Sequence, residues 1–359
     1  MKIKSFFGLI YFLSFCAIQS NAQWTDDTSI NTLVSDSGYF KNSIAYIEDG
    51  NGGYFMVYSE NHGFITSDDI YAQHIDADGY MLWGSGGAIV GNEVKVQTRA
   101  VIMLDGEDGI FVAWTDNRDS DKDGSNGTNN YKPAMARVDL SGNVLWSIVL
   151  DDDASYNFAI QPFPIHMISD DQGGAFVCWN TQVQLQYDDT FLQRVDADGN
   201  EMWDQDLNLA PIIYAQVDSQ LVSDGNGGCF IGWTDQRDNR YDFYIQHVDA
   251  AGNILWQQNG LPIIAELNNS NAEYLFLSDG QNGMYLAYLR RIGGSTETDV
   301  FAQRIGQDGT ELWGENGLSV CSAVDYQSEF KAVADSFNNL FCVWEDDRET
   351  ENSFSDVYT

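Results

Sequence analysis

Acidic side chains in the segment 119–127 have the spacing of a calcium-binding loop. Aspartates hold its first, third and fifth positions and a glycine the sixth, in the order Asp119, Asp121, Asp123, Gly124, with Ser125 next. Hard carboxylate oxygens converge on one point when the chain turns on such a glycine. The closing acid is absent, because Gly127 stands at the ninth position and Asn130 at the twelfth. Two interpretations stay open, a calcium site formed by the three aspartates and Ser125, or a solvated acidic loop.

An Asp-x-Arg motif follows an apolar strand in three places. The pairs are Asp116 with Arg118, Asp235 with Arg237, and Asp346 with Arg348. Repeated guanidinium groups could bind anionic or carboxylate ligands. The alternative is structural, because a planar guanidinium holds a carboxylate or a loop carbonyl through two hydrogen bonds and fixes neighbouring elements in register. Repetition favours the structural role, and we keep the three pairs as a candidate binding face.

Two further polar positions recur along the chain. One is arginine or histidine, at Arg137, Arg194, Arg304, His74 and His247, and the other is glutamine, at Gln73, Gln193, Gln246 and Gln303. Both are predicted to hold neighbouring repeats together. Motifs for a nucleophilic serine, a zinc protease or a phosphate-binding loop are absent from the sequence. A pair of carboxylates in an apolar pocket could still hydrolyse a glycan, but sequence spacing does not show such a pair.

These positions belong to an internal repeat, which must position any site. A turn rich in Asp and Gly recurs, and each copy is followed by an apolar strand that ends on an aromatic residue. The aromatics are Tyr58, Trp114, Trp179, Trp233, Tyr288 and Trp344, at spacings of 56, 65, 54, 55 and 56 residues. The chain therefore contains six copies of a unit of about 56 residues.

Each unit is predicted to form four short antiparallel strands. In the second copy these are 99–104, 110–115, 134–139 and 144–150. The strand 110–115 is apolar on both faces, which is typical of a strand sandwiched between two sheets. The sequence therefore predicts an all-β fold, a β-propeller of six four-stranded blades with negligible helix. The last copy ends before its fourth strand, and we expect the segment from Trp24 to Val34 to supply that strand and close the ring.

The turn before the fourth strand reads Asp-x-x-Gly-x-x-x-Trp. It stands as Asp76/Gly79/Trp83, Asp139/Gly142/Trp146, Asp196/Gly199/Trp203 and Asp249/Gly252/Trp256, while the fifth copy keeps Gly309 and Trp313. This turn resembles the PQQ-like repeat of quinoprotein propellers, one residue shorter between Asp and Gly. The chain also resembles secreted bacterial propeller-like repeat proteins that often carry a sorting domain of the type IX secretion system, which this sequence lacks. The quinone site would imply adjacent cysteines, and none exist here, so the resemblance implies a propeller without that cofactor.

The first 22 residues have the layout of a secretory signal peptide. Lys2 and Lys4 precede an apolar stretch from Phe6 to Ile18, and small residues precede Gln23. Cys16 offers a lipoprotein alternative, which the bulky Phe15 disfavours. We expect cleavage near Ala22, export to the periplasm, surface or medium, and one domain over residues 23–359. Four cysteines remain, Cys178, Cys229, Cys321 and Cys342, mostly in apolar runs, so buried free thiols are predicted.

The chain is strongly acidic, with 17 Lys+Arg against 54 Asp+Glu among 359 residues and a net charge of −37. Nucleic acids and anionic membrane surfaces select basic patches, so both are excluded as partners. No segment beyond the signal peptide is apolar enough to span a bilayer. Calcium is the one cofactor considered, and the protein is expected to be a monomer.

The loops after each second strand vary in length, whereas the other turns are short and repetitive. Variable loops on a rigid scaffold commonly carry binding. The leading hypothesis is therefore a secreted, non-catalytic scaffold that binds a protein or polysaccharide at the face shared by these loops and by the loops that join one unit to the next. One alternative is a glycan-active hydrolase or lyase with a carboxylate site near the propeller axis. Another is an adhesion or surface segment of a longer protein.

Overall fold

The structure is a computed structural model that describes residues 34–35, 37–62, 68–93, 95–117, 131–150, 165–183, 187–237, 241–264, 273–291, 297–324, 326–348 and 356–359. Within these ranges the chain is all-β and contains no helix. Consequently no helix in the described part of the chain is long and apolar enough to cross a membrane. The expected signal peptide, its cleavage site and the calcium loop lie outside the described residues.

Six antiparallel sheets follow one another along the chain, and we call them blades one to six. Blade one contains β1 (Phe40–Glu48), β2 (Tyr54–Asn61), β3 (Asp68–Ile75) and β4 (Ala88–Gly91). Blade two contains β5 (Gln97–Leu104), β6 (Ile110–Asp116), β7 (Lys132–Val138) and β8 (Val144–Val149). Blade three contains β9 (His166–Ser169), β10 (Ala175–Val183), β11 (Tyr187–Val195) and β12 (Leu207–Asn208). The four strands expected in the second copy are confirmed to within two residues.

The remaining three blades repeat this order. Blade four contains β13 (Gln216–Ser223), β14 (Cys229–Asp235), β15 (Asp242–Val248) and β16 (Leu261–Ile264). Blade five contains β17 (Tyr274–Ser278), β18 (Met284–Arg291), β19 (Thr298–Ile305) and β20 (Leu318–Cys321). Blade six contains β21 (Gln327–Ala334), β22 (Leu340–Asp346) and β23 (Asp356–Tyr358). The described residues thus form five four-stranded blades and one of three strands, in place of the six four-stranded blades expected.

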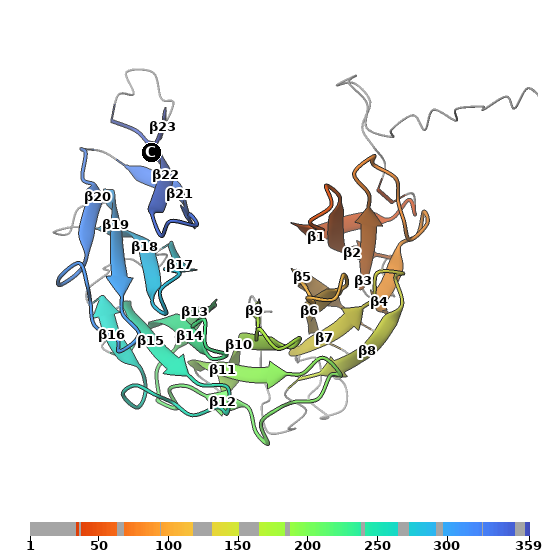
Figure 1. Cartoon of the computed structure of the whole chain (residues 1–359), viewed down its shortest axis with the longest axis horizontal. Helices are drawn as coiled ribbons and strands as arrows, with labels where there is room; N and C mark the ends of the chain where they lie inside the picture. Colours follow the sequence, from red (N-terminus) through yellow and green to blue (C-terminus); the bar gives the residue numbers. More distant parts are fainter. Residues whose placement is uncertain are drawn as a thin grey trace, which may run out of the picture.

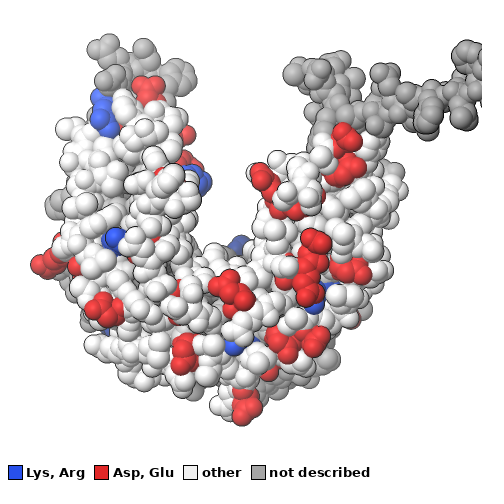
Figure 2. Space-filling view, in the orientation of Figure 1, with Lys and Arg blue, Asp and Glu red and all other residues white. Residues whose placement is uncertain are grey.

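The blades are arranged around an axis in an open arc, with the first strand of each blade innermost (Figure 1). Consecutive inner strands contact one another from β1 through β5, β9, β13 and β17 to β21. Blades one and six stand on opposite sides of a gap, which the space-filling view also shows (Figure 2). The fold is therefore propeller-like, but its described part is not a closed ring. Residues 24–33 of the proposed closing strand lie outside the described part, so that strand stays a prediction.

An aspartate organises the turn between the first two strands of each complete blade. In blade one, Asp49 Oδ1 accepts hydrogen bonds from the backbone N–H groups of Asn51 (2.7 Å) and Gly53 (2.9 Å). The same two bonds recur at Asp105, Asp170, Asp224 and Asp279. The turn ends in glycine because a Cβ at Gly53 would lie 2.3 Å from the backbone oxygen of Ile75.

The core lies between blades rather than at one centre. The second strands β6 and β14 are buried along their whole length, so the prediction of strands covered on both faces is confirmed. In blades one to four the tryptophan of the turn motif also crosses to the next blade: Trp146 Nε1 donates to the backbone oxygen of Ala197 at 2.8 Å, and Trp83, Trp203 and Trp256 make the corresponding bond. Of these tryptophans only Trp146 lies within a fourth strand, whereas the sequence placed all of them there. A Cβ at Gly199 would lie 2.7 Å from the Trp146 indole, which explains the glycine in this turn. All four described cysteines are buried free thiols, as the sequence predicts.

Candidate functional site

The inner strands carry an irregularity at one fixed position of the repeat, six residues before the turn aspartate. The ladder between the first two strands shifts there in blades one, two, four and six. The residues concerned have positive φ: Ser43 (50°), Arg99 (56°), Asp218 (56°) and Glu329 (47°). Such non-glycine backbone conformations are strained and cluster at functional sites. In blade five the same position is held by Glu273, just before β17.

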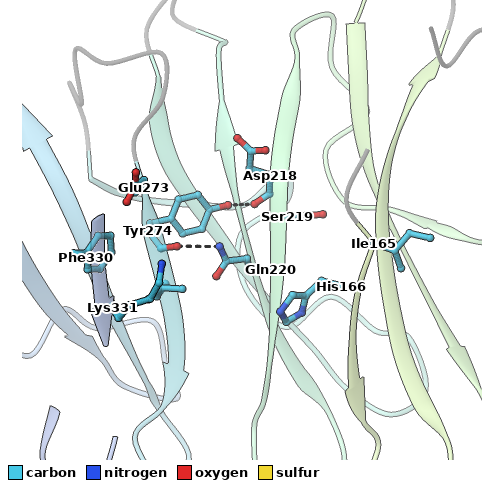
Figure 3. A pocket seen from close by; sticks show the side chains of 10 residues that line it. Ile165, His166, Asp218, Ser219, Gln220, Glu273, Tyr274, Phe330 and Lys331 are labelled. Atoms are coloured by element: carbon cyan, nitrogen blue, oxygen red, sulfur yellow. Dashed lines mark hydrogen bonds between the residues drawn. The ribbon is translucent and has the colours of Figure 1, made fainter. Parts of the chain in front are cut away.

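A pocket of about 630 Å³ lies at the inner strands of blades three to six, and we call it the axial pocket (Figure 3). Four blades contribute to it because their inner strands lie side by side around the arc (Figure 1). Its lining residues are Ile165, His166, Asp218, Ser219, Gln220, Glu273, Tyr274, Leu275, Phe330 and Lys331. Two carboxylates from the irregular position therefore face one cavity.

Asp218 is held in its strained conformation by both neighbouring blades. From blade five, the hydroxyl of Tyr274 donates to the backbone carbonyl oxygen of Asp218 (Figure 3). From blade three, Asn180 Oδ1 accepts from the backbone N–H of Ser219 (3.3 Å) and from its hydroxyl (3.1 Å). Asn180 Nδ2 also donates to the backbone oxygen of Gln216 at 3.0 Å. These contacts fix the backbone of the bulge before any ligand arrives, so the direction in which the Asp218 side chain leaves the strand is set in advance.

Gln220 joins blades four and five below the pocket. Its Nε2 donates to the backbone oxygen of Tyr274 at 3.0 Å, and its Oε1 accepts from the backbone N–H of Phe276 at 3.2 Å. β13 and β17 belong to different sheets, and the two bonds of this side chain connect their backbones. Asp218 lies two residues before Gln220, and Glu273 directly precedes Tyr274. The bonds of Gln220 therefore fix the relative position of the two backbone segments that carry these carboxyl groups.

The surroundings of the pocket shift the pKa of three of its titratable groups. Asp218 is exposed to solvent at the cavity, and partial desolvation by the surrounding blades raises the pKa of its carboxyl group above that of an ordinary aspartate. Desolvation also raises the pKa of Tyr274 well above its usual value and keeps the phenol a hydrogen-bond donor. Burial lowers the pKa of His166 to about 4. Its Nδ1 accepts from the backbone N–H of Leu221 at 3.1 Å, which leaves the neutral ring with an Nε2–H donor.

The aspartates of the candidate binding face lie at the ends of the second strands. In the two pairs that the structure describes completely, the arginine donates to the aspartate of its own pair. Arg237 contacts Asp235 through Nε (2.9 Å) and Nη2 (2.6 Å), and its guanidinium lies 3.7 Å from the ring centroid of Tyr244. Arg348 likewise donates to Asp346. Asp116 accepts from Trp114 Nε1 at 3.0 Å, and Arg118 lies outside the described residues. None of the five residues of these pairs that the structure describes lines the axial pocket.

Two of the three third-strand arginines, Arg194 and Arg137, connect successive blades, whereas Arg304 donates to Asp279 and Gln281 of its own blade. Arg194 donates to Asp170 Oδ2 through Nε (2.9 Å) and Nη2 (2.8 Å), and through Nη1 to the backbone oxygen of Ala250 (3.0 Å). Arg137 makes the corresponding bonds to Asp105 and to Ala197. In blades one and four the slot holds histidine, and His74 and His247 reach only the turn aspartate of their own blade, at 2.9 and 2.8 Å.

No metal centre is present in the described part of the chain: no group of three or more His, Cys, Asp or Glu side chains there could hold a metal ion. The four calcium-ligand candidates, Asp119, Asp121, Asp123 and Ser125, lie in a segment outside the described residues. Calcium binding therefore stays a prediction from the sequence.

Two adjacent aspartates on β11 form a second acidic site, away from the axial pocket. Burial raises the pKa of Asp188 and that of Asp189 to about 6. Asp189 is additionally close to the negative charge of Asp235, while Asn208 donates to its Oδ2 at 2.7 Å. With both carboxyl groups ionised at neutral pH, this pair opposes folding.

We expect Asp188→Asn to stabilise the protein at neutral pH. The folded-state pKa exceeds the ordinary carboxyl value, so folding favours the protonated form and ionisation costs stability as pH rises from about 4 to about 6. Urea unfolding near pH 7.5 should give the variant about 1 kcal/mol of extra stability, discounted for partial exposure. The gain should vanish near pH 4, and a variant less stable than the parent at both pH values would contradict this account.

Neither Asp218 nor Glu273 was predicted from the sequence to be a site residue. A signal was nevertheless present, because the position six residues before each turn aspartate holds Ser43, Arg99, Pro164, Asp218, Glu273 and Glu329. A position that is polar and variable inside an otherwise apolar strand differs from its surroundings in the repeat. The sequence does not reveal that this position faces the axis of the arc. The structure shows it, and it places the carboxylates of Asp218, Glu273 and Glu329 there in three successive blades.

Comparison with known proteins gives the following. No protein-family model and no curated protein matches the sequence. Among solved structures, the Hadza microbial sialidase Hz136 matches at 12% identity and a TM-score of 0.47, over 80% of this chain and 59% of its own. An ulvan lyase of polysaccharide lyase family PL25 matches at 12% and 0.48, over 84% and 77%. An endo-arabinase from Bacteroides thetaiotaomicron matches at 11% and 0.39, over 72% and 91%.

These similarities concern the propeller-like all-β fold, and this chain spans less than two thirds of the sialidase's length. The resemblances to PQQ-like repeats and to proteins of type IX secretion remain resemblances of sequence. The leading hypothesis of a non-catalytic scaffold, and the expectation that the protein is not an enzyme, are corrected. The solved structures to which this chain is similar are named as a sialidase, a lyase and an arabinase.

Proposed function

We propose that this protein is a glycan-active hydrolase whose acid–base chemistry takes place in the axial pocket. The observation that carries the proposal is Asp218, a carboxyl group with a raised pKa, held in a strained bulge by two neighbouring blades and facing the same cavity as Glu273. Glycoside hydrolysis requires a carboxylic acid kept protonated by its surroundings and a second carboxylate nearby.

Asp218 supplies the proton in this proposal. When the glycosidic bond breaks, the departing sugar oxygen takes the proton from the Asp218 carboxyl group, whose protein surroundings disfavour its charge before the reaction. The clamp from Tyr274 and Asn180 fixes the backbone on either side of Asp218, so the proton is presented in one direction. Tyr274 is a positioning residue, because its hydroxyl is committed to the Asp218 carbonyl.

Glu273 supplies the second carboxylate. It lies at the equivalent position of the next blade, and its backbone oxygen accepts from the N–H of Leu289 at 3.0 Å, which anchors it to β18. Its carboxylate either attacks the anomeric carbon or removes a proton from the attacking water. Attack by the carboxylate retains the anomeric configuration, and attack by the activated water inverts it. The separation of the two carboxyl groups decides which route is taken.

Hydrogen-bonding side chains and charge favour a neutral or amino-sugar glycan. Ser219 and the neutral His166 line the pocket with groups that suit sugar hydroxyls, and Lys331 is its only cationic side chain among the lining residues. Acidic side chains are spread over the visible face of the arc, with few basic ones (Figure 2). A polyanionic substrate would be repelled by that surface. Export directed by the expected signal peptide would bring the enzyme to such extracellular glycans.

The test is incubation of the purified protein with neutral and amino-sugar polysaccharides, followed by assay of released reducing ends. Ultraviolet absorbance of unsaturated products is recorded in parallel, because β-elimination by a lyase produces them and hydrolysis does not. We expect reducing ends without absorbance. The double variant Asp218→Asn/Glu273→Gln should be inactive, and Asp188→Asn, whose acidic site lies outside the pocket, should retain parental activity. Equal turnover by the double variant and the parent would contradict the proposal.

A further inference from the structure

Adjacent blades contact one another through one repeated pair of faces. The leading face is formed by the second and fourth residues of each second strand, which in blades one to five are buried against the next blade with 0–2% exposure. These residues are Phe55 and Val57, Phe111 and Ala113, Phe176 and Cys178, Phe230 in blade four, and Tyr285 and Ala287. Position 232 in blade four is glycine, because a Cβ there would meet Phe276 of blade five at 2.1 Å.

The trailing face is formed by two residues of each inner strand, next to the irregular position. They are Ala100 and Ile102, Ile165 and Met167, Ser219 and Leu221, Tyr274 and Phe276, and Phe330 and Ala332. Each apolar pair, or its apolar member, packs in the same cluster as the leading face of the preceding blade. The same apolar contact is therefore made at all five junctions of the arc.

At both ends of the arc one of these faces is left uncovered by the described part of the chain. In blade six, the leading-face residues Phe341 and Val343 are 54% and 37% exposed. In blade one, the trailing-face residues Ile44 and Tyr46 are 60% and 68% exposed. Apolar patches of this kind on soluble proteins mark interaction sites. The two uncovered faces are complementary, because they are the two halves of the contact that the chain makes five times elsewhere.

We propose that a second copy of this chain covers both faces, and that two arcs form a closed ring dimer. The open arc has two arms that lie on either side of one gap (Figures 1 and 2). A half-turn about an axis parallel to the arc axis, placed at the open side of the gap, brings blade one of the second copy onto blade six of the first, and blade six of the second onto blade one of the first. Strand direction and blade order are preserved, so each new junction joins a leading face to a trailing face, as the junctions within the chain do.

The second copy is the occupant with matching chemistry and register. In the structure the two faces of one chain are separated by the gap, so a single chain would have to bend at its blade junctions to join them. A head-to-tail contact between copies gives a closed ring when its rotation closes and a filament when it does not. The arms of the arc point in one direction, and this favours closure by two copies. The dimer replaces the monomer expected from the sequence.

The test measures molar mass by light scattering after size-exclusion chromatography. The parent protein should have twice the monomer mass at micromolar concentration. Phe341→Asp damages the leading face and Tyr46→Asp the trailing face, and each should weaken self-association about 100-fold or more, because both junctions of a homodimer then carry a buried charge. Ile213→Asp is the matched control, since Ile213 is 74% exposed and belongs to neither face, and it should leave the dimer intact.

Mixing the two face variants gives the sharper result. In a mixed dimer one junction carries both substitutions and the other carries none, so the equimolar mixture should form a heterodimer while each variant alone is a monomer. Misfolded variants would not complement each other in this way. A monomeric parent, a mixture that stays monomeric, or a filament would each overturn the proposal; a monomeric parent is also the result expected if the chain closes on itself through residues 24–34.

Discussion

Asp218→Asn should reduce kcat for glycan hydrolysis by about 10²- to 10⁴-fold, the contribution typical of a positioned general acid. KM should change little, because asparagine keeps the shape and the hydrogen-bonding atoms of the side chain. Since the acid must be protonated to act, activity of the parent should fall as pH rises through the pKa of Asp218, which desolvation places above the ordinary aspartate value. The measurement is the pH dependence of kcat on a glycan that the parent cleaves.

The stability of the same variant separates a catalytic role from a structural one. A carboxyl group with a raised pKa opposes folding once it is ionised, so Asp218→Asn should leave the protein as stable as the parent, or more stable, at neutral pH. Loss of activity together with unchanged thermal unfolding is the expected result. Similar losses of both would mean that Asp218 is needed for the fold and not for the chemistry.

Tyr274→Phe is the matched test of the clamp. It removes the hydrogen bond to the Asp218 carbonyl while keeping the ring, which packs in the core between blades four and five. A freer Asp218 is better solvated, so its pKa should fall and the decline in activity should move to lower pH. If Tyr274 served only the fold, the variant would contain less active enzyme, but the pH at which activity declines would stay the same.

Arg194→Met should destabilise the protein by about 3–5 kcal/mol, the cost of breaking a buried ion pair from one side. Asp170 is almost fully buried and accepts both guanidinium bonds through Oδ2, so the substitution leaves its charge without a partner there. The bond from Arg194 to Ala250 of the next blade is lost as well. Urea unfolding of the two proteins at neutral pH measures the difference.

Two controls locate the origin of that loss. Asp170→Asn added to Arg194→Met removes the stranded charge and keeps Oδ1, which accepts the backbone N–H groups of the turn, so part of the stability should return. Arg304→Met should cost less, because the Arg304 side chain is 24% exposed and that of Arg194 is 9% exposed. Equal losses for the two single variants would show that burial of the pair does not set the cost.

The repeat and its local chemistry were predictable from sequence because they depend on neighbouring residues. Asp49 and Gly53 form a turn whose hydrogen bonds close within five residues, and a strand such as 110–115 shows its two-sided burial in its own composition. Six copies of a unit of about 56 residues then indicated six sheets around an axis. The buried cysteines followed in the same way, from the apolar runs that contain them.

The open arc and the axial pocket could not be obtained in this way. Asp218 and Glu273 are 55 residues apart, and they share a cavity only because the inner strands of consecutive blades lie side by side. The raised pKa of Asp218 and the clamp by Tyr274 and Asn180 arise from three different blades. The sequence by itself thus determined the blades, through turn chemistry and periodic burial. The tertiary structure alone decided which polar residues meet and which apolar faces stay uncovered, because both depend on contacts between blades.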